Sequence, residues 1–245
     1  MKKITVILFL LCSSAILFSQ NYIAKYQDLS FNSMSAGTLV FNANSWRYDI
    51  SFDISISASF PQLSDKEINE MVADTKSNMG KSEKFKYVSL SDYCMFESPP
   101  VKLDGVIKSD LVKPEWNIVS DSVKMVGNYQ CVMATTNLCG YEITAWFAPE
   151  IPTISGVWRL WGLPGLIVSA KSSDGEINIE LISFEKTLYP PQKPVITTTM
   201  TKTECLTLTE LVMKKLQRQI QGISSSDNTD ISVSYSLSGD KCLFE

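Results

Sequence analysis

The sequence has 245 residues, with 22 Lys and Arg against 26 Asp and Glu, and it contains no histidine. The missing histidine excludes catalytic sites built on Ser-His-Asp or Cys-His groups and metal sites with imidazole ligands. The net charge of −4 argues against a nucleic-acid partner, which would require a basic surface to neutralise phosphates.

The first twenty residues have the pattern of a secretory signal peptide. Lys2 and Lys3 form a charged start, an apolar stretch follows, and polar Ser19 and Gln20 close it. We expect cleavage near Gln20, so that the mature chain starts at Asn21. The protein is then exported, with a location in the periplasm, at the outer membrane or outside the cell.

Two other interpretations of this segment fit less well. An uncleaved anchor is disfavoured because no stop-transfer run follows, and a lipid anchor on Cys12 because Leu10 and Leu11 precede it where small residues are usual. Removal of residues 1–20 leaves 225 residues and, because two lysines are lost, a net charge of −6. No later stretch reaches the ~18 apolar residues that a membrane span requires.

Alternation of apolar and polar residues dominates the mature chain and predicts β-strands. It is strict over residues 52–60 and returns over 177–181. Asp104-Gly105 and Asp174-Gly175 lie between apolar runs and predict tight hairpins, and Gly127-Asn128 predicts a third turn. Sequential hairpins of this kind build an antiparallel meander.

Two segments have helical patterns instead. Ser64 to Glu67 is a capping box that predicts a helix to about residue 79, and Thr207 to Glu210 predicts another that ends at Gly222. Pro190, Pro191 and Pro194 mark a connector, and a last strand is predicted over 231–237. The predicted fold is mainly β (α+β), a curved antiparallel meander sheet with two helices packed on it, in a single domain over 21–245.

Five cysteines remain after signal cleavage, so at least one has no partner within the chain. Cys131 and Cys139 are close in sequence, but the predicted hairpin places Cys139 at its tip and separates their Cα atoms by roughly 15 Å, beyond disulfide reach. We expect Cys205 and Cys242 to form a disulfide across the last helix. The sequence has no Cys-x-x-Cys pair, so neither a zinc site nor a thioredoxin-type redox pair is indicated. We expect no metal site and no cofactor.

An aromatic and proline-rich stretch over residues 145–168 is the candidate binding region. Two prolines follow an apolar strand, and Gly-Leu-Pro-Gly at 162–165 predicts a rigid turn. The aromatic side chains either cover the end of the sheet or form a surface for a ligand or partner. The candidate binding residues are Trp146, Phe147, Glu150, Trp158, Trp161, Gly162, Leu163, Pro164 and Gly165.

The stretch Gly-Leu-Pro-Gly-Leu-Ile at 162–167 resembles the motif that names the GLPGLI family of exported Bacteroidetes-type proteins. Two further blocks are similar to that family, one from Trp116 to Thr136 and one over 145–152, although Phe147 stands where the family has a tyrosine. Because the family has no known function, the resemblance implies an exported protein and no particular activity.

Three functional hypotheses follow. The first is a non-catalytic binding or carrier module in the cell envelope, in which the sheet and the Trp-rich loop hold an apolar ligand or a protein, and no catalytic residue is assigned. The second is an extracytoplasmic hydrolase that acts on peptide or glycan through carboxylates such as Asp49, Glu150 or Asp174. The third is an accessory subunit of an outer-membrane transport or secretion system.

Overall fold

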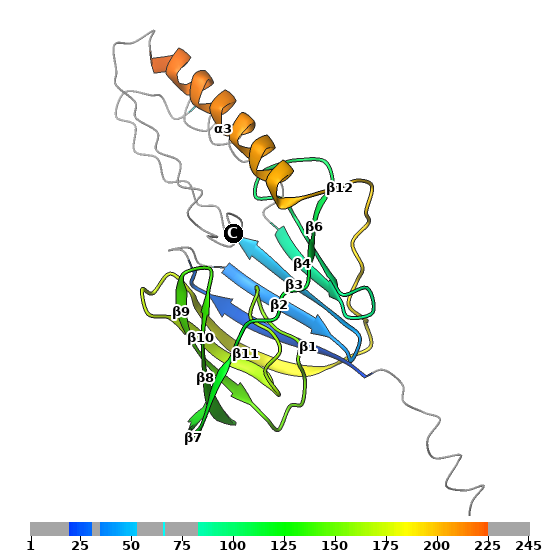
Figure 1. Cartoon of the computed structure of the whole chain (residues 1–245), viewed down its shortest axis with the longest axis vertical. Helices are drawn as coiled ribbons and strands as arrows, with labels where there is room; N and C mark the ends of the chain where they lie inside the picture. Colours follow the sequence, from blue (N-terminus) through cyan, green and yellow to red (C-terminus); the bar gives the residue numbers. More distant parts are fainter. Residues whose placement is uncertain (1–19, 31–34, 53–65, 67–82, 225–245) are drawn as a thin grey trace, which may run out of the picture.

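In this computed structural model, the described residues are 20–30, 35–52, 66 and 83–224. They form one twelve-stranded sheet and a helix, drawn in Figure 1. The first six strands are β1 Asn21–Asp28, β2 Ser35–Phe41, β3 Ser45–Phe52, β4 Glu83–Ser89, β5 Cys94–Glu97 and β6 Val106–Asp110. The other elements are β7 Asn117–Val126, β8 Tyr129–Leu138, β9 Tyr141–Ala148, β10 Leu166–Ser172, β11 Asn178–Thr187, β12 Thr199–Met200 and α3 Lys202–Ser224.

The sheet consists of two antiparallel meanders joined side by side. Its strand order is β12-β6-β5-β4-β3-β2-β1-β11-β10-β9-β8-β7, so the pairing of β1 with β11 links the two halves. Only the two-residue strand β12 is parallel to its neighbour, β6, which makes the sheet mixed. The predicted meander is therefore confirmed for most of the sheet, and Figure 1 shows that the sheet is curved.

The main hydrophobic core lies on one face of this sheet. Alternate residues of the strands point into it, including Leu39 and Tyr48 from one half and Ile143 and Phe147 from the other. The connection between β9 and β10, residues 149–165, folds back over this face and is called the β9–β10 loop below. It contributes five buried hydrophobic side chains to the core: Val157, Trp158, Leu160, Trp161 and Leu163.

Hydrogen bonds and ring contacts hold the β9–β10 loop in this position. The indole of Trp161 packs against Trp46 of β3 at 5.6 Å between ring centroids and donates a hydrogen bond to the Val112 carbonyl at 3.0 Å. The Trp116 indole donates in turn to the Trp161 carbonyl at 2.8 Å. Because both indole N–H groups have partners, the two tryptophans are placed without the penalty of an unsatisfied donor.

The opposite face, called the outer face, carries a smaller cluster that a proline-containing connection covers. Tyr87, Phe96 and their neighbours on β4–β6 pack against Ile196 of the segment 188–198. This segment joins β11 to β12, and the Arg47 guanidinium donates to the Gln192 carbonyl at 3.2 Å. The predicted proline connector is thus confirmed, and it crosses from one half of the sheet to the other.

The helix prediction is corrected in two respects. The helix α3 begins at Lys202, because Thr201 and Glu204 form a capping box six residues before the expected one at Thr207. It also does not pack along the sheet: its first turns bury Cys205 and Thr209, and the rest extends away from the strands (Figure 1). The described part of the chain contains this one helix, and the other predicted helix, 64–79, lies outside it except for Lys66.

The turn predictions had mixed outcomes. Gly127-Asn128 joins β7 to β8 and Asp174-Gly175 lies in the β10–β11 connection, as expected. Asp104-Gly105 does not form a tight hairpin, because residues 98–105 are one long connection from β5 to β6. Residue Phe52 ends β3, and the rest of the predicted strand 52–60 lies outside the described residues, as does the strand 231–237.

Both glycines of the Gly-Leu-Pro-Gly turn have a steric function. Gly162 has φ of +88°, a backbone conformation that side chains with a Cβ rarely adopt. Gly165 lies directly against the Ala148 carbonyl, and a Cβ at this position would overlap the carbonyl oxygen. The turn sequence is therefore explained by the close approach of the β9–β10 loop to the end of β9.

The cysteine prediction is wrong for Cys205. Its thiol is free and is buried in the first turn of α3 against Ile107 and Met200, so it does not pair with Cys242. Cys94 and Cys131 are also free and buried, whereas Cys139 is disulfide-bonded. The rejection of a Cys131–Cys139 bond is confirmed, since Cys139 and Gly140 form the β8–β9 turn.

We expect Gly165→Ala to lower the free energy of unfolding by about 2 kcal/mol or more, because the added methyl group overlaps the backbone of β9. Pro164→Ala, one residue earlier on the exposed side of the turn, is the matched control and should change it by less than about 1 kcal/mol. Denaturant unfolding of both variants measures the free energy of unfolding. An equal decrease in the two variants would contradict the steric explanation.

We expect Cys94, Cys131 and Cys205 to resist alkylation by iodoacetamide at neutral pH in the folded protein and to react once it is denatured without reductant. Burial both blocks access and raises the pKa of these thiols. Peptide mass mapping identifies the labelled cysteines. Labelling of Cys205 only after reduction would show that it is in a disulfide after all.

Candidate functional site

Most of the candidate residues in the Trp-rich region are core residues. Trp158 and Trp161 are 8% and 7% exposed, and Phe147 and Leu163 are more deeply buried. Glu150 and Pro164 are exposed, and Trp146 is half-buried. The interpretation in which the aromatic side chains cover the sheet accounts for this arrangement, and Trp146 is left as the aromatic candidate that faces a cavity.

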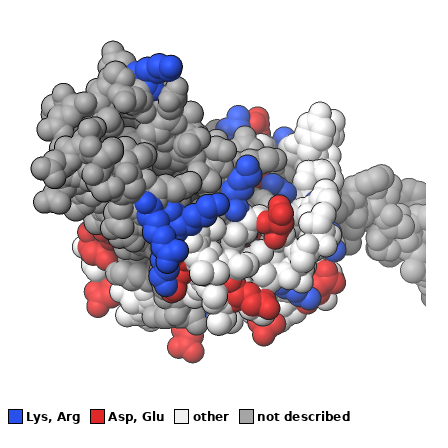
Figure 2. Space-filling model, turned by 90° about the horizontal axis from the view of Figure 1, so that it is seen from above, with Lys and Arg blue, Asp and Glu red and all other residues white. Residues whose placement is uncertain are grey.

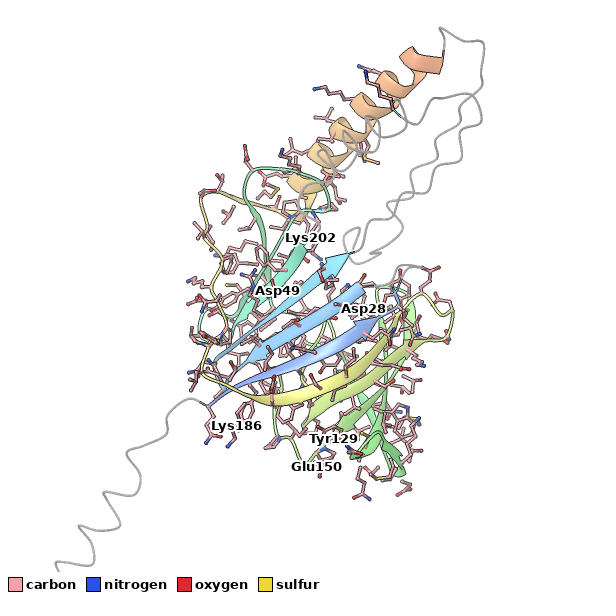
Figure 3. The ribbon with its side chains drawn as sticks, turned by 180° about the vertical axis from the view of Figure 1, so that it is seen from behind. Asp28, Asp49, Tyr129, Glu150, Lys186 and Lys202 are labelled. Carbon is pink, nitrogen blue, oxygen red and sulfur yellow. The ribbon has the colours of Figure 1, made fainter. Side chains whose placement is uncertain are left out.

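The three candidate carboxylates do not converge. Asp49 accepts from the Arg47 guanidinium at 2.8 Å, and Asp174 accepts from the Ser172 hydroxyl at 2.6 Å within its turn. Glu150 is exposed at the start of the β9–β10 loop, and Figure 3 shows it far from Asp49. A two-carboxylate hydrolytic mechanism therefore has no support from their placement. The described residues also contain no group of three or more His, Cys, Asp or Glu side chains arranged to hold a metal.

A buried ion cluster connects the β9–β10 loop to the other half of the sheet. Glu97 of β5 is 2% exposed and pairs with Lys86 of β4 and with Arg159 of the loop, the latter at 2.8 Å. Burial alone would raise the pKa of Glu97, but the two cations outweigh it and lower the pKa to about 2. The cluster therefore stays ionised at physiological pH and holds the loop in register.

Charges of both signs occur on the exposed surface. Seen from above, the described surface carries a band of Lys and Arg side chains, with Asp and Glu side chains around it (Figure 2). Positive charge thus gathers locally although the chain as a whole has a net charge of −4.

A cavity of about 620 Å³ lies on the outer face of β7 to β11 and is the main candidate for a ligand site. We call it the outer groove. Its size lies within the range of small-molecule sites. Its lining combines apolar surface with polar and charged groups, among them Lys124, Tyr129, Trp146, Lys171, Glu180 and Leu181.

Strand alternation explains why the outer groove and the core share the same strands. Phe147 and its alternate neighbours on β9 point into the main core, so Thr144 and Trp146 point to the outer face. Beneath them, Cys131 and Val168 form a small buried cluster against which Trp146 packs. The floor of the groove is therefore fixed by packing from below.

The charged groups of the outer groove have different partners. The Lys124 ammonium lies over the Trp146 ring, 3.9 Å from its centroid, a cation–π contact. Lys171 and Glu180 form an ion pair at 2.7 Å, and about half of each side chain is exposed. The Cys131 thiol below is not a nucleophile at neutral pH, because burial raises its pKa to about 11.

Trp146 is the one outer-groove residue among the sequence candidates. The contributions of Tyr129, Lys124 and the Lys171–Glu180 pair were not predicted, because they come from strands that meet only through the pairings of β7 to β11. A local signal did exist, since the alternation in residues 141–148 separates Trp146 from the core residue Phe147.

Comparison with known proteins gives a short family match. A family model described as "Protein of unknown function (Porph_ging)" matches residues 139–169, which contain β9, the β9–β10 loop and the start of β10. No curated protein matches the chain. The family match therefore covers the loop and two strands below the outer groove and brings no activity with it.

The structural similarities are distant. Two structures of PNGF-II, in space groups P21 and C2, match with TM-scores of 0.50 and 0.52 at 12% and 13% identity. The matched regions cover 75% and 80% of this chain but only 31% and 33% of those chains, so the chain spans about a third of PNGF-II. An uncharacterized conserved protein from Thermus thermophilus has a TM-score of 0.40 at 7% identity, over 80% of this chain and 99% of that one. At these identities the PNGF-II likeness shows a shared fold alone.

Within the described residues, the single helix lacks the apolar length needed to cross a bilayer.

We expect Glu97→Gln to lower the free energy of unfolding by about 3 kcal/mol at neutral pH, because Lys86 and Arg159 keep their charges and lose their carboxylate. The folded-state pKa lies below the ordinary value of 4.5, so this stabilisation is present above pH 4.5 and is lost as the pH falls toward 2. The variant should therefore also lose part of the acid dependence of its stability.

Denaturant titrations over this pH range measure both effects. Glu180→Gln, which removes one partner of the exposed Lys171–Glu180 pair, is the control and should cost less than about 1 kcal/mol. If the two variants lost the same stability, or if Glu97→Gln kept the acid dependence of the parent, the interpretation of the buried cluster would be wrong.

Proposed function

We propose that this protein is an exported, non-catalytic binding module that holds a small amphiphilic ligand in the outer groove. Export is supported by the charged, apolar and polar succession of residues 1–20. The binding role rests on one observation: a half-buried Trp146 forms part of a cavity of about 620 Å³ on the face of the sheet that the core does not use.

The lining of the groove indicates the kind of ligand. Trp146, Tyr129 and Leu181 offer apolar surface for a ring or a short chain, while Asn128, Ser169 and the charged groups can bind a polar end. An entirely apolar molecule would leave these polar groups without water or a partner. A ligand with one apolar part and one polar part uses both.

The rigid loop on the core face supports this site indirectly. The β9–β10 loop joins the two strands that carry Trp146 and Ser169, and the pairing of these strands shifts register between Ile167 and Ser169. Fixing the loop in the core therefore fixes the groove floor on the other face. We further propose that the chain is a GLPGLI-type protein, on the strength of residues 162–167 and the match over 139–169.

We expect protein recovered from its own envelope fraction to carry a bound small molecule that native mass spectrometry detects, and Trp146→Ala to lose it. The substitution removes the indole surface of the groove and leaves the core side of β9 unchanged. Tyr189→Ala is the control, because Tyr189 is 75% exposed and does not line the groove. Absence of a bound molecule in the parent protein, or equal retention by both variants, would overturn the proposal.

A further inference from the structure

The cation over Trp146 differs from the other charges of the outer groove. Lys171 already has a carboxylate partner in Glu180, whereas Lys124 makes no ion pair with the described residues. Its ammonium is held by the face of an aromatic ring, a contact that orients the charge without neutralising it. The lining with two lysines and one glutamate thus has a net positive charge in an acidic protein.

We propose that the ligand of the outer groove is an amphiphile with a single negative group, which binds Lys124 while its apolar part lies against Trp146 and Tyr129. This inference rests on the proposed function and adds the charge of the ligand to it. The distance of 3.9 Å between the ammonium and the ring centroid places the charge next to the apolar surface, so one molecule can reach both.

Other ligand charges fit this lining less well. A cationic ligand would have to displace Lys124 from the ring and would also meet Lys171, and among the lining residues Glu180 alone could favour it. A neutral ligand would gain nothing from the ammonium. A group with two or more negative charges would find one cation without a carboxylate partner, because Glu180 neutralises the other.

The net negative charge of the whole chain means that only groups close to the ligand can attract an anion. At −4 overall, the protein repels anions at long range, so a preference for an anion has to arise from the groove itself. Salt should weaken the preference, because Lys124 is exposed to solvent and its charge is screened.

Two fluorescent probes that differ by one charged group test the proposal. The first is 8-anilinonaphthalene-1-sulfonate, which carries one negative charge, and the second is N-phenyl-1-naphthylamine, the same ring system without the sulfonate. We expect Lys124→Met, which removes the charge and keeps an unbranched side chain of similar size, to weaken binding of the sulfonate probe about tenfold and to leave binding of the neutral probe unchanged. Lys186→Met is the matched control, since Lys186 is exposed and does not line the groove.

Trp146→Ala separates this inference from the proposed function. If Trp146→Ala weakens the binding of both probes and Lys124→Met weakens the binding of the sulfonate probe alone, the proposal is supported. If Trp146→Ala weakens the binding of both probes but Lys124→Met changes neither, or changes both equally, the groove binds ligands and the selection for a negative charge is overturned. If Trp146→Ala changes neither probe, the groove is not a binding site, and both the inference and the proposed function are overturned.

Discussion

A curved sheet of this size has to bury one of its faces, and here a loop contributes much of the cover. The β9–β10 loop places five hydrophobic side chains against both halves of the sheet, among them Trp161 in contact with Trp46 of β3. In the described residues, α3 contributes only its first turns to the packing. The position of the loop therefore decides whether the core face is closed. Its sterically restricted glycines, Gly156, Gly162 and Gly165, and its ion-paired Arg159 follow from that requirement.

The same two strands that hold the loop also carry the outer groove. On β9, Phe147 belongs to the core and Trp146 to the groove, so a change in the register of this strand would exchange their faces. This coupling explains how the most recognisable part of the sequence can be structural and still matter for binding. The turn residues need not touch the proposed ligand, because they fix the strands that line the outer groove.

The sequence was sufficient for features that depend on neighbouring residues. Alternation indicated the strands, and the turns at Gly127 and Gly175 identified two of the connections. It was not sufficient where distant segments decide the outcome. Asp104-Gly105 is a typical hairpin sequence. In the structure, however, these two residues end an eight-residue connection between β5 and β6, so no tight hairpin forms there. The start of α3 was misplaced because two capping patterns follow each other, and only the position of β12 shows that Thr201 is the cap.

For the candidate site, the sequence did not show which aromatic side chains are buried. The sequence identified Trp146, Trp158 and Trp161 as large side chains in one region, but composition alone cannot separate an aromatic that fills a core from one that lines a groove. Strand alternation could have separated Trp146 from the core residues, because it lies within β9, whereas Trp158 and Trp161 lie in a loop where no periodicity applies. The charged part of the groove depends on β7, β10 and β11, which are far apart in the chain.

The pairing of β1 with β11 has a consequence for the order of folding. Tyr22 lies opposite Lys186, so the first strand of the sheet finds its second neighbour only after most of the chain is available. Long-range pairing of this kind is slow, because a large loop has to close before its contacts form. If the chain crosses a membrane from its N-terminus, β1 to β3 emerge before β11. The edge of β1 that pairs with β11 then stays unpaired until the meander from β7 to β11 has formed. During that interval the unpaired edge of β1 is available for association with another chain.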